Sequence, residues 1–529
     1  MARKRNKKRR KKKRRDRNTP IKQHRKKGKT LTTQLGAMSN VQQMIWDKNM
    51  LPEFLWIDAL ARSYNDKPIW WRAFTNFMDA VDAQIDDDLL VTGTISDFGK
   101  IPDEAREVIL KEQYDLVVAN FAEPVGRTLS LYPECPARWL IPRDWRDQNR
   151  VDPDVELKKL SDALGRLYPA KDDYCSLLRM FPFQRIVKKG KIRVPSEMVD
   201  MLAKYPDGLD EGDRFLVESL ARQSLNMVLH NPEDKNDDFQ WAKHFWRQNH
   251  NLSVCMYAPD KSLSFMGDRS KDVDYVTQVI YPKCEENIEI LRKYLVELIL
   301  KVKVDLYDTE RHEVVFGLLS RCNELYKALL GNPLMLSLDL SGIILRCLAD
   351  TTITLSYLLS KDELSLFQKF VEYGEGKQKL LMLHLQDNYP GLYGPAGEDE
   401  ESLREQLGDF NAELLSIELG HWAGVDTRRM AQDCDLMDIY RLVYDPASSA
   451  VHGTWQNVVA SNLERCANPL HRFHYLPRTR NAPLFIHPLI VATRIVNKAI
   501  EHCREKAGFP PLEEPLNTFM DDPQDASEG

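Results

Sequence analysis

The sequence lacks the motifs that identify several common classes of enzyme and secreted protein. It has no Cys-x-x-Cys pair, no G-x-x-x-x-G-K-[ST] loop and no G-x-G-x-x-G segment after a strand pattern. These absences argue against redox, NTP-dependent and dinucleotide-dependent enzymes. The nine cysteines lie far apart, as expected for reduced thiols in an intracellular protein. The basic N-terminus has no apolar segment behind it, so we expect no secretory signal.

Metal ligands at the spacings typical of zinc sites are also missing. His471 and His474 form an HRFH segment, and His244 lies near His250, but neither pair has partner ligands close by in the sequence. Cys466 is isolated from other thiols. We therefore expect no metal site and no cofactor.

A long uncharged apolar run is absent as well. The most apolar stretch, residues 334–359, contains Asp339, Arg346 and Asp350, and its central charge-free run covers only residues 340–345. A membrane span needs about 20 apolar residues. The stretch is therefore predicted to be a buried helix of a soluble protein that has no membrane partner.

What the sequence does have is a strong segregation of charge. Residues 1–30 hold 18 Lys and Arg and one acid, whereas the rest of the chain carries a net charge of −22. The whole-chain value of −5 conceals this asymmetry. Ile21 is the one large aliphatic side chain in the segment, so residues 1–35 are predicted to be a disordered arm.

The arm predicts binding to nucleic acid, either RNA or DNA. Each Lys or Arg that neutralises a phosphate releases counterions whatever the base sequence, and the absence of interleaved aromatic residues argues against base stacking. Two other interpretations stay open: a nuclear or nucleolar address in a eukaryote, and docking of the arm on the acidic body. Otherwise the expected location is cytoplasmic. The residues assigned to phosphate binding are Arg3, Lys4, Arg5, Lys7, Lys8, Arg9, Arg10, Lys11, Lys12, Lys13, Arg14, Arg15 and Arg17.

Apolar periodicity near 3.6 residues predicts a mainly α-helical chain. Residues 36–280 are expected to form a mainly helical N-terminal domain. Within it, residues 186–194 place two apolar pairs on either side of Lys-Lys-Gly-Lys, which predicts a small β-hairpin.

The second half of the chain predicts a helical bundle over residues 281–508, with the apolar helix 334–359 at its centre. The last helix should begin near Pro488 and end at Gly508, because proline favours a helix start and glycine a helix end. Residues 509–529, with six acids and no Lys or Arg, are predicted to be an acidic tail.

Three charged residues lie on the predicted central helix. Asp339, Arg346 and Asp350 are separated by seven and four residues, which places them on one face, so Arg346 can bridge the two carboxylates. Such a group is either a satisfied internal ion pair or part of a site.

A second candidate lies in the segment YRLVYDPASSAVHGTW at 440–455. Asp445 followed by Pro446 predicts a helix start, so Arg441 should end one helix and His452 should lie nearly two turns into the next. Gly453 would then lie within that helix, which suggests close packing of another backbone there.

Two hydroxyls precede the histidine in this segment. Ser448 and Ser449 stand four and three residues before His452, so a Ser–His contact is geometrically available. A lone histidine beside serine is equally typical of a buried, hydrogen-bonded residue.

At these residues the C-terminal half resembles an uncharacterised all-helical family of bacterial proteins, over roughly residues 285–505. The resemblance rests on Arg-Cys-Leu-Ala-Asp at 346–350, Leu-Leu-Ser-Lys at 358–361, HWAGVDTRRMAQ, and Ser-Ser-Ala-Val-His-Gly at 448–453. It implies a helical bundle and a bacterial origin.

A more remote resemblance is to HEPN-type helical domains, many of which are metal-independent ribonucleases of toxin and antiphage systems. The family pattern is an Arg and a His on one helix that cut RNA across a homodimer interface. Here the resemblance implies His452 as general base and Arg441 or Arg346 as the group that steadies the phosphorane, with Asp350 beside them. In this sequence Arg441 and His452 are eleven residues apart, with Pro446 between them.

Three functions therefore follow from the sequence. The leading expectation is a nucleic-acid-associated protein whose arm binds phosphates without sequence preference. The alternative is a HEPN-like ribonuclease effector of bacterial defence. The third is a scaffold whose arm docks on its own acidic surface.

Overall fold

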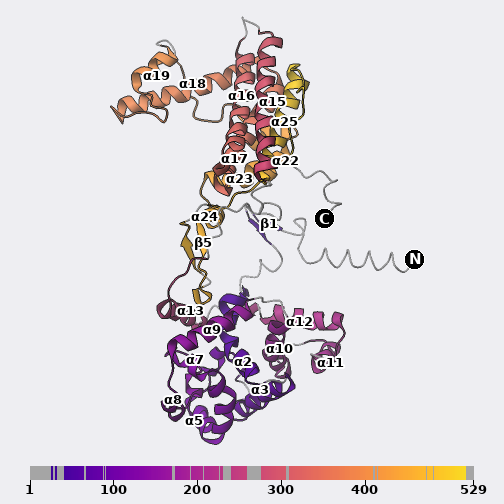
Figure 1. Cartoon of the computed structure of the whole chain (residues 1–529), viewed down its shortest axis with the longest axis vertical. Coiled ribbons are helices and arrows are strands. Elements are labelled where there is room, and N and C mark those ends of the chain that lie inside the picture. The colour runs from indigo at the N-terminus through magenta and orange to yellow at the C-terminus, as the bar shows by residue number, and fades with distance from the viewer. Residues whose placement is uncertain are drawn as a thin grey trace, which may run out of the picture. The chain divides into compact units, whose positions relative to one another are not determined.

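The computed structural model divides into two compact units, and the first is discontinuous in sequence (Figure 1). Unit 1 comprises residues 1–258 and 465–474, and unit 2 comprises residues 259–464 and 475–529. The described residues are 25–27, 30–32, 41–43, 45–64, 67–86, 89, 91–168, 173–190, 192, 194–205, 208–225, 227–229, 240–258, 276–304, 309–408, 412–413, 415–471, 474–479 and 482–519.

Helices dominate both units, which confirms the predicted mainly α fold class. The strands in the described part of the chain form three short two-stranded pairs. β1 (Arg25–Lys27) is antiparallel to β2 (Thr30–Thr32), so part of the segment predicted to be a disordered arm is a hairpin. The predicted phosphate-binding residues 3–17 lie outside the described residues.

Unit 1 is built from short helices, with one antiparallel pair between β3 and β4. Its elements after β2 are β3 (Val41–Gln43), η3 (Trp46–Met50), α2 (Leu51–Ser63), α3 (Lys67–Asp82), α4 (Ile95–Phe98), α5 (Asp103–Glu112), α6 (Tyr114–Val117), η4 (Val118–Gly126), α7 (Arg127–Ser130), η5 (Arg138–Leu140), α8 (Arg143–Gln148), α9 (Pro153–Leu167), α10 (Asp173–Lys188), α11 (Ser196–Lys204), α12 (Glu211–Leu225), β4 (Met227–Leu229), α13 (Gln240–Leu252) and η9 (Pro469–His471).

Helix α2 lies in the core of unit 1, and Trp56 is the aromatic centre of that core. Its ring centroid lies 5.4–5.6 Å from those of four phenylalanines, which are Phe74, Phe77, Phe98 and Phe121. The indole N–H donates to the carbonyl of Gly93 at 2.7 Å. Tilted and edge-on aromatic pairs at this separation add to the stability that burial provides.

The β-hairpin predicted at residues 186–194 is not formed. Ile186 and Val187 belong to the last turn of α10, and Gly190 follows with a φ of +67°. The Lys-Lys-Gly signal is therefore a helix end, because glycine adopts the left-handed conformation there without a steric cost. Ile186 and Val187 pack against the core of unit 1 from the last turn of α10 instead of alternating between two strand faces.

Unit 2 is a bundle of long helices, as the sequence predicted. Its elements are η6 (Val276–Ile280), α15 (Tyr281–Lys301), α16 (Thr309–Gly331), η7 (Pro333–Leu336), α17 (Leu338–Lys361), α18 (Leu364–Asp387), α19 (Glu400–Leu407), α21 (Thr427–Asp433), α22 (Met437–Ile439), η8 (Tyr440–Tyr444), α23 (Asp445–Val451), α24 (Trp455–Ser461), β5 (Leu463–Arg465), β6 (Tyr475–Pro477) and α25 (His487–Ala507).

Helix α17 is the centre of the bundle. It packs against α16 and α25 and, near its first half, against α23. By length and composition alone α17 could cross a membrane: it has 24 residues, its most apolar 18-residue window has a mean hydropathy of 1.3, and 56% of that window is buried. We interpret it as a core helix, because its buried face is covered by neighbouring helices of the same unit.

The ends of the bundle match the sequence signals in one place and depart from them in another. Helix α25 has Pro488 in its first turn and ends before Gly508, whose φ is +69°, as predicted. Residues 509–519, predicted to be part of an acidic tail, pack on unit 2 instead. Phe509, Leu516 and Phe519 are buried in its core, because this part of the segment carries large apolar side chains on both sides of its two adjacent acids.

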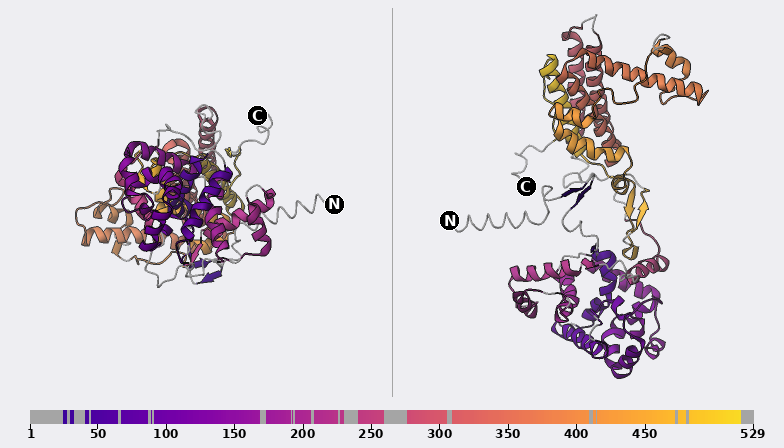
Figure 2. Two further views of the ribbon diagram at one scale, coloured as in Figure 1. Left: turned by 90° about the horizontal axis from the view of Figure 1, so that it is seen from below. Right: turned by 180° about the vertical axis from the view of Figure 1, so that it is seen from behind.

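Helix α18 extends away from the bundle and packs with α19 along its outer part, as Figure 1 and the view from behind in Figure 2 show. Met382 and Leu385 of α18 form a small separate core with Leu403 and Leu407 of α19. The Pro- and Gly-rich segment between these helices is a loop. The outer part of α18 and α19 is therefore held together by its own apolar contacts.

Unit 1 also buries one carboxyl group. Glu53 of α2 is 1% exposed; its Oε2 accepts the Ser96 backbone N–H at 2.7 Å and its Oε1 accepts the Ser96 hydroxyl at 2.6 Å. Burial outweighs these hydrogen bonds and raises the pKa of Glu53 from 4.5 to about 8. The folded protein therefore holds a proton that the unfolded chain releases at lower pH.

We expect unit 1 to lose stability as pH rises from about 4.5 to about 8, because the unfolded state releases the Glu53 proton first. The full effect is on the order of a few kcal/mol. Glu53→Gln should flatten this slope, whereas Glu104→Gln, an exposed site on α5, should leave it unchanged. Urea unfolding at several pH values measures the difference, and equal slopes in wild type and Glu53→Gln would contradict it.

Candidate functional site

Arg346 is the centre of a polar cluster in unit 2. Its side chain is 19% exposed, its Nε donates to Ser448 Oγ at 3.0 Å, and its guanidinium carbon lies 3.3 Å from the centroid of the Tyr444 ring. Asp350 Oδ2 is 3.5 Å from its Nη1. A planar guanidinium can stack on a ring while it donates in its own plane, so Arg346 joins α17 to η8 and α23.

The predicted bridge between two carboxylates is only half formed. Asp339 accepts a hydrogen bond from Asn457 Nδ2 at 2.7 Å, and no ion pair between Asp339 and Arg346 occurs among the described residues. Seven residues span about 10 Å along a helix. The Arg346 guanidinium stacks on the Tyr444 ring and donates to Ser448 rather than pairing with the distant carboxylate of Asp339.

The helix that carries His452 begins earlier than predicted. Asp445 does not cap a helix start; α23 continues directly from η8, and the residue before Asp445 is already helical. Helical backbone therefore runs without a break from Arg441 to Val451. The wider π-helical turn η8 comes just before Pro446, the residue that cannot donate a backbone hydrogen bond to the turn before it.

His452 ends α23 and is exposed. Gly453 follows with a φ of +56°, and the N–H of Thr454 donates to the carbonyl of Ser449 at 3.1 Å, the pattern of a glycine helix end. A Cβ at Gly453 would have no atom within 4 Å. Gly453 is therefore required by its backbone conformation, and the predicted close packing of another backbone is wrong.

The two serines before His452 have other partners. Ser448 Oγ donates to the Tyr444 carbonyl at 2.7 Å and accepts from Arg346, and Ser449 Oγ donates to the Pro446 carbonyl at 2.6 Å. Neither hydroxyl bonds to the His452 imidazole in the described part of the chain; the His452 backbone N–H donates to the Ser448 carbonyl at 3.0 Å, as a helix bond. The Ser–His contact is thus not made in this conformation.

The four residues predicted as catalytic do not converge. Arg346 and Asp350 are paired, whereas Arg441 and His452 are exposed and their side chains form no hydrogen bond or ion pair among the described residues. The guanidinium of Arg346 lies over Tyr444, eight residues or about 12 Å of helix before His452. Arg346 therefore points toward the start of α23 and His452 lies at its end.

A separate apolar pocket of about 420 Å³ lies beside this cluster. It is bounded by α17, α23, α24 and α25, with Ser341, Ser449, Asn457 and His487 among its polar lining residues. Gly342 lets α17 and α23 approach closely here, because a Cβ at this position would lie 2.9 Å from Ala450 Cβ. Neither Arg346 nor His452 lines the pocket.

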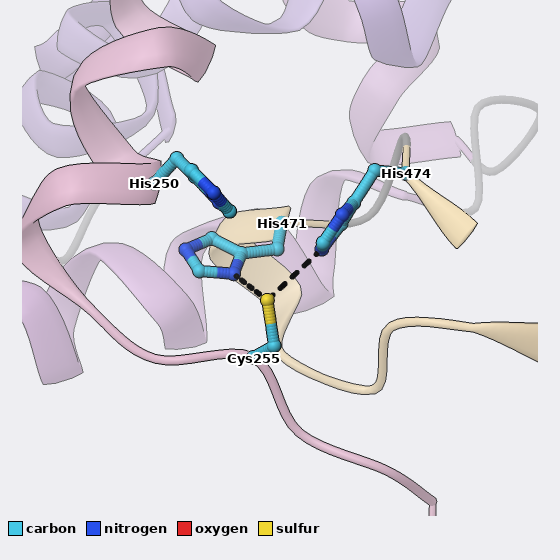
Figure 3. Close-up of side chains that lie close together, drawn as sticks. All are labelled: His250, Cys255, His471 and His474. Carbon is cyan, nitrogen blue, oxygen red and sulfur yellow. Dashed lines mark hydrogen bonds between the residues drawn. The ribbon is translucent and has the colours of Figure 1, made fainter. Parts of the chain in front are cut away.

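Sequence reasoning missed a histidine and cysteine cluster in unit 1 (Figure 3). His250, Cys255, His471 and His474 place one potential ligand atom each within 4.8 Å of one another. Cys255 Sγ lies 3.6 Å from His471 Nδ1 and 3.4 Å from His474 Nε2. Cys255 and His471 are 216 residues apart, so no local spacing could reveal the cluster.

His244, which lies near His250 in the sequence, is not part of this cluster. His244 Nδ1 lies 2.7 Å from Glu134 Oε2 instead. The one sequence signal that pointed toward the cluster was the HRFH segment, since His471 and His474 both belong to it.

We expect Arg346 and Tyr444 to be energetically coupled, because the ring and guanidinium are half-buried and in contact. A double-mutant cycle with Arg346→Ala and Tyr444→Leu should give a coupling free energy of about 0.5–2 kcal/mol, measured by urea unfolding of the full chain. Tyr444→Phe, which keeps the ring, should preserve the coupling. A coupling near zero would show that the stacking contributes nothing.

Comparison with known proteins bears on unit 2. No curated protein matches the chain, and no solved structure matches it. A comparison with protein families does find a matching region. It begins in α16 and ends at β5, so it contains α17, the Arg346 cluster and His452. Residues 312–465 match the family of unknown function DUF5677, and the C-terminal half of the chain thus carries the uncharacterised domain that its motifs predicted.

Proposed function

We propose that this chain is a nucleic-acid-associated protein that binds phosphates through its basic N-terminal segment. The observation that carries the proposal is the separation of charge, with a net charge of +17 in residues 1–30 and −22 in the rest. Counterion release makes such a segment bind DNA or RNA without regard to sequence. The acidic remainder repels phosphates, so binding depends on the segment.

The cysteines support an intracellular site of action. All nine are free thiols, and seven of them are buried. Proteins that keep many thiols unpaired belong to reducing compartments. We propose a cytoplasmic location, or a nuclear or nucleolar one if the chain is eukaryotic, where the nucleic acid partner is present.

The binding should disappear when the positive charge is removed. We expect a variant with all thirteen Lys and Arg of residues 3–17 changed to Ser to lose nearly all affinity for labelled single-stranded RNA and duplex DNA. The wild-type affinity should fall roughly 10³- to 10⁵-fold between 50 and 200 mM salt if six to ten phosphates are contacted. Fluorescence anisotropy across a salt series measures both effects.

The matched control keeps the charge and changes the side chains. A variant with Lys at all thirteen positions should bind nearly as well as the wild type, because phosphate neutralisation depends on charge. Equal binding by the Ser variant would overturn the proposal. Absence of binding by the wild type, together with a size that expands in high salt, would instead support docking of the segment on the acidic body.

One observation favours a second function, a metal-independent ribonuclease of bacterial defence. Arg441 and His452 are both exposed on one unbroken helical stretch within the DUF5677 region. An exposed imidazole can act as general base on a ribose hydroxyl, and an exposed guanidinium can stabilise the charge that develops on the phosphate. Since Arg346 points away from His452, Arg441 is the better candidate for that role, in one chain or across a homodimer.

This second function predicts RNA cleavage that depends on His452. His452→Ala should lower the single-turnover cleavage rate at least about 100-fold while binding is unchanged, because the basic segment supplies the binding. His384→Ala, which removes an exposed histidine on α18, is the control and should cut as the wild type does. A wild-type protein that leaves RNA intact, in EDTA and in Mg²⁺, would exclude the ribonuclease.

A further inference from the structure

We propose that His250, Cys255, His471 and His474 bind one Zn²⁺ ion as a closed structural site in unit 1 (Figure 3). The four side chains come from the end of α13, the segment that follows it, the end of η9 and the residue before β6. All four positions belong to unit 1. The proposal does not depend on the nucleic-acid function.

The distances agree with a tetrahedral zinc centre. Zn–N bonds of about 2.0–2.1 Å and a Zn–S bond of about 2.3 Å place neighbouring ligand atoms about 3.3–3.7 Å apart. The sulfur of Cys255 lies 3.6 Å from His471 Nδ1 and 3.4 Å from His474 Nε2. The ring of His250 faces the other two imidazoles, with centroids 5.1 and 5.4 Å away.

The ligand types select the ion. Three imidazoles and one thiolate suit Zn²⁺, whereas Mg²⁺ and Ca²⁺ require oxygen ligands. Four protein ligands fill a tetrahedral shell and leave no position for a water or a substrate. The site is therefore structural rather than catalytic.

One ligand is already oriented by its surroundings. His471 is 5% exposed, and its Nε2 lies 2.9 Å from the carbonyl of Asn249 and 3.0 Å from Ser253 Oγ. An Nε2–H that donates to this carbonyl leaves the lone pair on Nδ1, the atom that faces Cys255. A backbone carbonyl behind a histidine ligand is the usual device that fixes its tautomer and ring orientation.

The acceptor behind His471 is itself held firmly. Asn249 is fully buried, and its Oδ1 accepts a hydrogen bond from the hydroxyl of Tyr132. Tyr132 packs in the aromatic core of unit 1 against Trp241 and Phe245 of α13. The orientation of the ligand is thus set by the core, which a chance meeting of surface histidines would not provide.

The place of the site in the chain indicates what the ion would do. The chain leaves unit 1 after residue 258 and returns at residue 465, and the four ligands lie on both sides of this excursion. Around the cluster, the N–H of Ala467 donates to the Met256 carbonyl at 2.7 Å, and Asn468 Nδ2 donates to the Val254 carbonyl at 2.8 Å. A zinc ion would hold the two segments together, and because the four ligands meet only in the folded chain, the binding free energy of the ion would add to the stability of unit 1.

The test uses the full-length wild-type protein and Zn²⁺ alone. Protein purified without a metal-affinity tag or chelator should contain one zinc per chain by elemental analysis. Removal of the ion by a strong chelator should lower the thermal unfolding midpoint, and stoichiometric Zn²⁺ should restore it. These measurements use no mutation, so they test the proposal even if a ligand variant fails to fold.

Variants then assign the ligands. Cys255→Ser and His474→Gln should each weaken zinc binding more than the 10- to 100-fold that loss of a supporting residue costs, measured by competition with a chromophoric chelator. His244→Gln, on the same helix but bonded to Glu134, should bind zinc like the wild type. With Co²⁺ in place of Zn²⁺, the thiolate charge-transfer band should appear in the wild type and be absent from Cys255→Ser.

Three results would overturn the proposal. The first is wild-type protein that neither contains zinc nor is stabilised by it, which would make the cluster a metal-free hydrogen-bonded group. The second is equal zinc affinity in Cys255→Ser, His474→Gln and His244→Gln. The third is a Cys255–Cys466 disulfide in protein from reducing cells, found by peptide mapping, since that bond would consume the thiolate ligand.

Discussion

The return of residues 465–474 to unit 1 is the constraint on which the architecture depends. Leu470 of this segment is buried in the unit 1 core, the hydroxyl of Tyr168 donates to the carbonyl of Pro469, and His471 is held against Asn249. Unit 1 therefore cannot complete its core until the chain beyond residue 464 has been made. Contacts between residues so far apart in the sequence form slowly during folding. The zinc ion proposed at this junction would stabilise them once they have formed.

Within unit 2, the corresponding constraint is that the central helix α17 must bury apolar residues and also accommodate charged ones. Its central position demands apolar residues on most of its surface, yet Arg346 and Asp350 interrupt it at the side that meets η8 and α23. The guanidinium is accommodated because Tyr444 and Ser448 satisfy its face and its edge while the partner carboxylate stays half exposed. If Arg346 were buried without these partners, its uncompensated charge would strongly destabilise the folded state.

The sequence was informative where structure depends on near neighbours. The apolar character of α17 and the proline and glycine at the ends of α25 are local signals, and both helices formed where they were predicted. The wrong predictions also came from local signals. A Lys-Lys-Gly run reads equally as a hairpin turn and as a helix end, and only the packing of α10 decides between them.

The sites show the same division more sharply. Arg346 and Asp350 lie one helical turn apart, so their pairing could be predicted from the sequence, whereas the contacts with Tyr444 and Ser448 required the fold to bring α23 alongside α17. The cluster of His250, Cys255, His471 and His474 depends entirely on the chain's return. Sequence spacing reveals a metal site only when its ligands share a local segment, and here two short ligand pairs come together across an intervening domain.

The proposed function assigns different roles to the basic N-terminal segment and to the folded body. In the proposed function the basic segment would need no fold to attract phosphates, because counterion release depends on charge. The remaining residues, with a net charge of −22, would be repelled by the same polyanion. Arg441 and His452 are open to solvent in unit 2, so under the proposal they would stay accessible while the segment binds.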